Sequence, residues 1–134
     1  MPATTIASVT AARTIAPAIT PNADFYQIDV SLTPPAVEVA DWSLSIGGMV
    51  DSPRTLTYAD LQALPSIERH VTLTCVSNEV GGDLVGNALW SGVHLRTILE
   101  MAGPRPEATQ VVGRSVDGFT AGFPTAHALD PAHE

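Results

Sequence analysis

The residues best suited to chemistry in this chain are its single cysteine, Cys75, and the loop that follows it. By the alternation of residues 71–75, Cys75 ends an expected strand, on the same apolar face as Val71 and Leu73. Reactive groups often lie on loops that a rigid scaffold positions, and residues 77–87 form a loop with three glycines. A thiolate there would be a soft metal ligand, whereas a lone cysteine is most often a small buried apolar side chain.

The four histidines are a second source of ligands or bases, but their spacing favours neither use. No two of them lie three or four residues apart, and His70 falls on the strand face opposite to Cys75. A Cys–His zinc site is therefore disfavoured. The Cys–His pair of a hydrolase is also disfavoured, although residues distant in sequence can meet in a fold. His127 and His133 are expected to be solvated surface groups.

The loop after Cys75 does not match a phosphate-binding motif. Residues 78–82 (NEVGG) have neither the GxGxxG nor the GxxxxGK[ST] spacing, and all six basic residues of the chain are arginines. A nucleotide site is therefore disfavoured. Glu79 is close enough in sequence to influence the protonation of Cys75, but a solvated acid on a loop is the simpler interpretation.

Composition indicates one acidic globular domain. A chain of 134 residues with 45% apolar and 15% charged residues can bury a single core, and one cysteine allows no internal disulfide. The net charge of -8 repels phosphate backbones, so nucleic acid is not expected as a partner. No stretch approaches the roughly 18 apolar residues that span a bilayer, and no signal peptide is visible. We therefore expect a cytoplasmic protein or a soluble piece of something longer.

Short periodic segments separated by turns predict an α+β fold with mixed β-sheets and a few short helices. Residues 1–21 are expected to be a flexible lead-in, and residues 22–134 the domain. Strands are expected over residues 25–31, 42–46, 71–75, 111–112 and 119–123, the last two joined at the hairpin turn Asp117-Gly118. Helices are expected after the capping box of Thr57 and Asp60, over residues 95–102, and from residue 125.

The same patterns predict which side chains form the core. The strand 71–75 is expected to lie inside its sheet, with the helix 95–102 packed on that sheet. The side chains expected to be largely buried are Trp42, Leu73, Leu95, Ile98 and Leu99.

Two neighbouring segments resemble the sulfite oxidase family. Residues 72–82 (TLTCVSNEVGG) are similar to the family's cysteine segment, and residues 84–95 (LVGNALWSGVHL) to the Trp-x-Gly-Val-x-Leu segment that follows it. Upstream, residues 20–26 (TPNADFY) resemble the family's opening segment. Residues 42–50 and 56–64 resemble the strand and helix that come next. The resemblance covers about 110 residues, from Thr20 to Leu129.

The resemblance implies a molybdenum cofactor and assigns residues to it. It implies a molybdenum atom held by the dithiolene of a pterin and by one cysteine thiolate, which is Cys75 here. It also implies that Asn22, Phe25 and Tyr26 lie against the pterin or the metal pocket. Ser115 matches a position where the family often has a hydroxyl that contacts the cofactor. Trp90 and Gly92 are expected to pack the loop instead of touching substrate.

The implied activity is two-electron oxygen-atom transfer on a small sulfite- or sulfoxide-like substrate, with an electron-transfer partner. Oxygen-atom transfer of this kind needs a centre that cycles through a two-electron change, and a cofactor supplies that centre. The form CVSNEVGG is closer to exported bacterial members of the family. The parent protein is therefore expected to be extracytoplasmic or membrane-tethered.

One departure from the family concerns the end of the chain. Family domains continue past the position of Glu134, and that part supplies arginine and glycine-rich contacts to the pterin phosphate. We therefore expect a truncated domain that is inactive by itself, binds no pterin and pairs with another copy through exposed edges. The alternatives left open are a cofactor-free binding or assembly module and a cysteine-based hydrolase.

Overall fold

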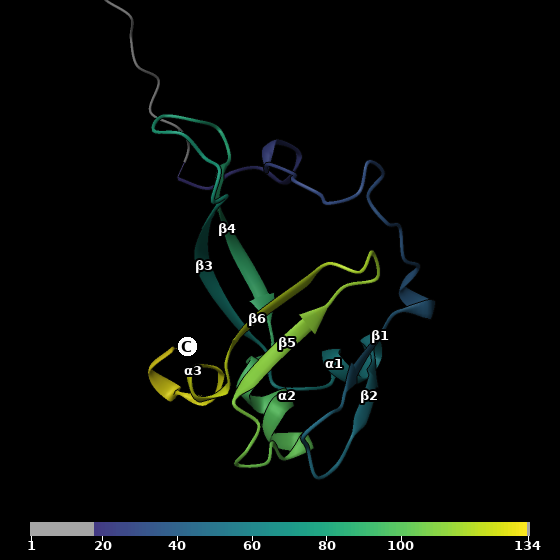
Figure 1. Cartoon of the computed structure of the whole chain (residues 1–134). Helices are drawn as coiled ribbons and strands as arrows, with labels where there is room; N and C mark the ends of the chain where they lie inside the picture. The colour runs from purple at the N-terminus through teal and green to yellow at the C-terminus, as the bar shows by residue number, and fades with distance from the viewer. Residues whose placement is uncertain (1–17, 134) are drawn as a thin grey trace, which may run out of the picture.

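Antiparallel two-stranded sheets and short helices make up residues 18–133, the part of the chain that the computed structural model describes (Figure 1). The strands are β1 (Ser43–Ile46), β2 (Arg54–Thr57), β3 (Ile67–Thr74), β4 (Val85–Gly92), β5 (Gln110–Arg114) and β6 (Thr120–Pro124). The helices are α1 (Tyr58–Gln62), α2 (Leu95–Ala102) and α3 (Thr125–Leu129), with 3-10 turns η1 (Asn22–Asp24), η2 (Val39–Asp41) and η3 (Pro131–His133). The predicted α+β class is confirmed.

The β1–β2 hairpin and the helix after it form as their local sequence predicts. Leu44 and Ile46 are half-buried while Ser43 and Ser45 are exposed, which is the alternation of a strand with one covered face. At the end of β2, the Thr57 hydroxyl accepts a hydrogen bond from the Asp60 amide at 3.2 Å. The Asp60 carboxylate accepts one from the Thr57 amide at 2.9 Å. This capping box starts α1.

Helix α2 carries most of the core. Ile98, Leu99 and Ala102 are buried, as the helical spacing predicts. Leu95 is 41% exposed, so its predicted burial is wrong, because it is the first residue of the helix and borders an open hollow. Gly103 ends the helix with a positive φ of 66°, a conformation that glycine adopts without strain.

The hairpin of β3 and β4 is more open than predicted. The two strands pair from Ile67–Gly92 to Thr74–Val85, and β3 has no other strand neighbour among the described residues. The prediction that residues 71–75 form an inner strand is therefore wrong. The predicted burial of Leu73 is wrong for the same reason, since this side chain is 41% exposed.

Trp42 is less covered than predicted. Its side chain is half-buried, and its indole ring meets the ring of Tyr58 edge to face with 5.8 Å between centroids. This contact joins the start of β1 to the start of α1. The expectation that Trp42 is largely buried is therefore wrong in degree.

The predicted strand over residues 25–31 does not form. After η1 the chain runs irregularly to η2, and Ile28 and Val30 are 60% and 65% exposed. No described strand pairs with this segment, and an alternating pattern without a partner edge gains neither ladder hydrogen bonds nor a covered face. Pro34 and Pro35, which lack amide hydrogens, come after two further residues.

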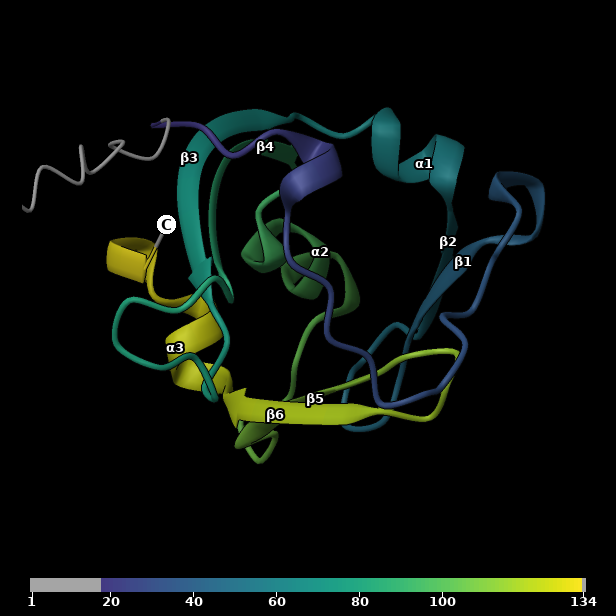
Figure 2. The ribbon, with the colours of Figure 1, turned by 90° about the horizontal axis from the view of Figure 1, so that it is seen from above.

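The C-terminal elements agree with their predicted positions. Strands β5 and β6 form a hairpin whose turn contains Gly118 with a φ of 87°, and α3 follows β6 directly. Seen from above, β3–β4, β1–β2 and β5–β6 lie on different sides of the molecule with α2 between them (Figure 2). Residues of β1, α2 and β5 border an open, largely apolar hollow of about 820 Å³. The buried Thr125 hydroxyl also borders it and has no hydrogen-bond partner among the described residues.

Candidate functional site

Cys75 is the first residue after β3, at one end of the β3–β4 hairpin. Its amide donates to the Leu84 carbonyl at 2.9 Å, so the hydrogen-bonded ladder continues one step beyond the strands. The residue is half-buried and its thiol forms no disulfide. The sequence prediction of a cysteine delivered by a strand end into a loop agrees with this geometry.

Ser77 is the side-chain partner of the Cys75 sulfur. Its hydroxyl oxygen lies 3.1 Å from the Cys75 Sγ. Hydrogen bonding from the Ser77 hydroxyl, and then from the Ser77 backbone amide, lowers the pKa of the Cys75 thiol. A thiol with a lowered pKa is more readily the thiolate, which is the form that binds a metal. Ser77 was not predicted, although its spacing of two residues from Cys75 is visible in the sequence.

Phe25 covers the face of the hairpin on which Cys75 lies. Gly86 pairs with Leu73, and directly paired residues point to the same face, so Gly86, Leu73 and Cys75 share a face. A Cβ on Gly86 would lie 2.6 Å from Cε2 of Phe25, so the phenyl ring occupies the space that this glycine leaves open. The ring also meets Trp90 edge to face, with 6.0 Å between centroids. Phe25 is thus brought to the Cys75 side of the hairpin.

The rest of the opening segment lies next to Phe25. Tyr26 stacks on Phe25 with ring centroids 5.5 Å apart. Asn22 is exposed and is the first residue of η1. Its carbonyl accepts a hydrogen bond from the Phe25 amide. Figure 1 shows this segment beside the Cys75 end of β3 and β4. Phe25 and Tyr26 therefore pack at the start of β4, on the face of the hairpin that Leu73 and Cys75 share, and the contact of Asn22, Phe25 and Tyr26 with a cofactor stays a prediction.

Residues just before η1 are tied to the outer edge of β4. The Thr20 amide donates to the Asn87 carbonyl at 2.8 Å, and the Asn87 amide donates to the Thr20 hydroxyl at 3.1 Å. The Asn87 side chain adds a hydrogen bond to the Ala18 carbonyl at 2.6 Å. These contacts fix the chain ahead of Phe25. Residues 1–17 of the predicted lead-in lie outside the described residues.

Ser115 is not brought to Cys75. It follows β5 in the hairpin turn, where its amide donates to the Phe119 carbonyl and its hydroxyl bonds to Asp117. In both views this turn lies away from the loop 75–84 (Figures 1 and 2). Its predicted contact with the cofactor stays a prediction, and the described geometry gives it no shared site with Cys75.

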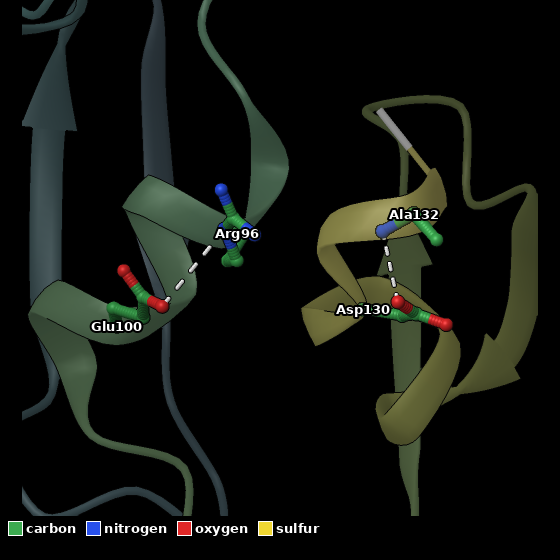
Figure 3. A network of polar contacts seen from close by, with 4 residues as sticks. All are labelled: Arg96, Glu100, Asp130 and Ala132. Carbon is green, nitrogen blue, oxygen red and sulfur yellow. Dashed lines mark hydrogen bonds and ion pairs between the residues drawn. The ribbon is translucent and has the colours of Figure 1, made fainter.

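Two histidines form a cluster that the sequence did not predict. The rings of His127 and His133 lie 3.7 Å apart, and His133 Nδ1 is 3.1 Å from an Asp130 carboxylate oxygen. The other Asp130 oxygen accepts a hydrogen bond from the Ala132 amide, which lowers the pKa of Asp130 (Figure 3). On α2, Arg96 pairs with Glu100 (Figure 3). Both histidines are exposed, as predicted.

Neither this cluster nor any other supports a multi-ligand metal site. Within residues 18–133, no group of three or more histidine, cysteine, aspartate or glutamate side chains could hold a metal ion. In the same part of the chain, the hydrogen bonds of Cys75 go to Ser77, Asn78 and Leu84, and none goes to a histidine. The described geometry therefore provides one cysteine as a metal ligand. A metal bound there needs its other ligands from a cofactor.

A model of the oxidoreductase molybdopterin binding domain family matches residues 31–133. The chain belongs to this family. This match confirms the expected resemblance to sulfite oxidases. It also confirms molybdenum–pterin as the cofactor of the family.

Individual relatives agree with the family match. The chain is 32% identical over 87 residues to the uncharacterized oxidoreductase YuiH of Bacillus subtilis (strain 168), covering 65% of this chain and 42% of that protein. It is 29% identical over 110 residues to the sulfite oxidase of Arabidopsis thaliana, covering 71% and 28%. The solved structure of the sulfane dehydrogenase SoxCD from Paracoccus pantotrophus aligns with a TM-score of 0.64 at 25% identity, covering 72% and 28%. The chain spans less than half the length of each of these proteins.

The residues present fit the metal end of such a cofactor better than its phosphate end. Cys75 offers a half-buried thiol with a lowered pKa, which suits one thiolate bond to molybdenum. The loop 75–84 contains no arginine or lysine. Three of the arginines are engaged elsewhere: Arg54 with the Met101 carbonyl, Arg96 with Glu100 and Arg105 with Asp51.

The structure also bears on membrane association. None of the helices in the described part of the chain is long and apolar enough to cross a bilayer.

Proposed function

We propose that Cys75 is the protein ligand of molybdenum in a pterin cofactor. The observation that carries this proposal is the position of its sulfur. Cys75 ends a regular ladder, its backbone is held on both sides, and hydrogen bonding with Ser77 lowers the pKa of its thiol, which favours the thiolate. Thiolate is the soft, strongly donating ligand that a redox-active metal of this kind accepts, and a serine oxygen is a poor substitute. The proposed role of Phe25 and Tyr26 is to shield that side of the metal from water.

The proposed activity of the full-length gene product is oxygen-atom transfer to a small sulfite-like anion. The bound cofactor would supply the two-electron change, and an external electron-transfer partner would then restore its oxidation state. The similarity to a sulfite oxidase supports the oxidative direction. Reduction of a sulfoxide-like substrate is the alternative direction, and the two are separated by assaying both substrates. A small-molecule substrate agrees with the acidic surface, which does not favour nucleic acid.

The cellular location of the protein is proposed from the same resemblance. The form CVSNEVGG favours an extracytoplasmic or membrane-tethered protein, which fractionation of the source cells would test.

We also propose residues 22–134 as the domain, with residues 1–21 as the segment that leads into it. Exposed strand edges favour association of the 134-residue chain with itself. Light scattering that reports only monomer at high concentration would contradict this last point.

The experiment that tests the proposed function uses Cys75→Ser in a host that synthesises the cofactor. We expect the full-length wild type to contain molybdenum and to oxidise sulfite, and the variant to lose turnover. Because the change in volume is small, the melting temperature should shift little. A purely structural cysteine would give the reverse, a lower melting temperature with full turnover per molybdenum. That result would refute the proposal.

A second candidate is a cofactor-free binding or assembly module built on the same fold. It is favoured by the lack of basic residues in the loop 75–84, which leaves no side chain there to hold a phosphate. Metal and pterin analysis of the full-length product separates the two candidates, since a module of this kind would contain neither.

A further inference from the structure

The loop that carries Cys75 has little apolar packing. Val76 and Val80 are 103% and 108% exposed, so they bury nothing on the domain, and Leu84 at the end of the loop is half-buried. With so little apolar packing, a loop of ten residues keeps one shape only if its polar groups are satisfied within it. The source of its order must therefore be sought in hydrogen bonds between the described residues of the loop.

Asn78 makes the bonds that close this loop. Its side-chain oxygen accepts the Leu84 amide at 2.9 Å, and its own amide donates to the Cys75 carbonyl at 3.0 Å. The Leu84 carbonyl in turn accepts the Cys75 amide at 2.9 Å. Cys75, Asn78 and Leu84 thus form a closed ring of three hydrogen bonds, in which both backbone polar groups of Cys75 are used.

Gly82 packs against the same amide and shows how closely the loop is fitted around it. A Cβ at Gly82 would lie 2.6 Å from the Asn78 side-chain oxygen and 3.0 Å from the Glu79 carbonyl. The Gly82 amide donates to that carbonyl at 2.9 Å. Asn78 is half-buried, in contrast to the exposed valines on either side of it. The loop is therefore folded around the Asn78 side chain.

We infer that Asn78 is the positioning residue of Cys75, which fixes where the sulfur and its Ser77 partner lie by closing the loop 75–84. The consequence for metal binding rests on the proposed function, whereas the closure of the loop does not. A ligand whose backbone is fixed before the metal binds loses less conformational entropy on binding, so loss of Asn78 should weaken metal retention without removing a ligand.

The test compares Asn78→Ala with Asn78→Asp and with Asn87→Ala in the full-length gene product. Aspartate keeps an oxygen acceptor at the same place, so it should preserve the bond from Leu84. Asn87→Ala removes two side-chain hydrogen bonds from the same hairpin, one from the Thr72 hydroxyl and one to the Ala18 carbonyl, both outside the loop. Amide exchange should become about five- to tenfold faster at Leu84 and Cys75 in Asn78→Ala, the effect of losing one hydrogen bond. The other two variants should exchange at the wild-type rate at these positions.

Exchange at Leu84 that stays at the wild-type rate in Asn78→Ala would overturn the inference. So would an equal acceleration in Asn87→Ala, because the loop would then respond to any weakening of the hairpin. Molybdenum per protein provides the second readout, and it should fall in Asn78→Ala and persist in Asn78→Asp. Equal metal content in all variants would overturn the link to Cys75. A wild type without molybdenum would refute the proposed function, and the exchange rates would still decide whether Asn78 closes the loop.

Discussion

Among single residues, Gly86 has a defined role because the Phe25 ring lies where a side chain would be. We predict that Gly86→Ala displaces this ring from Trp90 and costs about 1–3 kcal/mol of unfolding free energy, as overpacking typically does. The measurement is a urea unfolding curve followed by tryptophan fluorescence. Gly92→Ala is the matched control on the same strand, since a Cβ at Gly92 meets nothing within 4 Å. Equal midpoints for the two variants would show that Phe25 does not pack on Gly86.

The position of Cys75 could be predicted from sequence, but its immediate partners could not. Alternation of residues 71–75 places the cysteine at a strand end, and β3 ends at Thr74. The contacts of Ser77 and Asn78 depend on the course of a loop that no periodic pattern describes. The contact of Phe25 with Gly86 joins residues far apart in the chain, and only the folded arrangement of the opening segment on β4 creates it.

Among the elements, α1 depends on a capping box whose strength varies with pH. Hydrogen bonds from the Thr57 hydroxyl and then the Thr57 amide lower the pKa of Asp60 in the folded state. A carboxyl group with a lowered folded pKa adds stability above its unfolded pKa, and that stability is lost as pH falls through the folded value, near and below about pH 4. We predict that Asp60→Asn is less stable than wild type at pH 7 and that the difference shrinks in acid. Melting temperatures across this range measure it, and a constant difference would contradict the prediction.

Helix α2 provides a second prediction at this scale. Leu99 is 7% exposed, so Leu99→Ala should cost about 2–5 kcal/mol, as large-to-small changes in a core do. Leu95→Ala is the matched control on the same helix and should cost less, because Leu95 is 41% exposed. Denaturation midpoints compare the two. An equal loss in both would mean that Leu95 is covered in solution.

The elements with strong local signals were predictable, and those that depend on distant partners were not. The capping box of α1, the apolar stripe of α2 and the Asp117-Gly118 turn are each specified within a few residues. Residues 25–31 alternate like a strand but have no strand partner within residues 18–133. In the same range, β3 looks like an inner strand but pairs with β4 alone. Whether an alternating segment is paired, and on how many sides, is decided by the whole fold.

For the molecule as a whole, the lack of basic side chains beside Cys75 leads to a prediction about cofactor binding. The 134-residue chain has no basic side chain in the loop 75–84, and a buried phosphate needs arginines or oriented amides. We therefore predict that residues 1–134, made by themselves in a cofactor-synthesising host, retain no stoichiometric molybdenum. Metal analysis of the purified chain is the measurement. Stoichiometric metal in it would show that residues 1–134 suffice.

The central claim is that the Cys75 sulfur bonds to molybdenum, and X-ray absorption at the molybdenum edge tests it most directly. The comparison is between the full-length gene product and its Cys75→Ser variant, each purified with bound metal. We predict that the metal in the variant has one sulfur neighbour fewer than in the wild type, with the pterin sulfurs unchanged. The same number of sulfur neighbours in both proteins would contradict the assignment of Cys75 as the ligand.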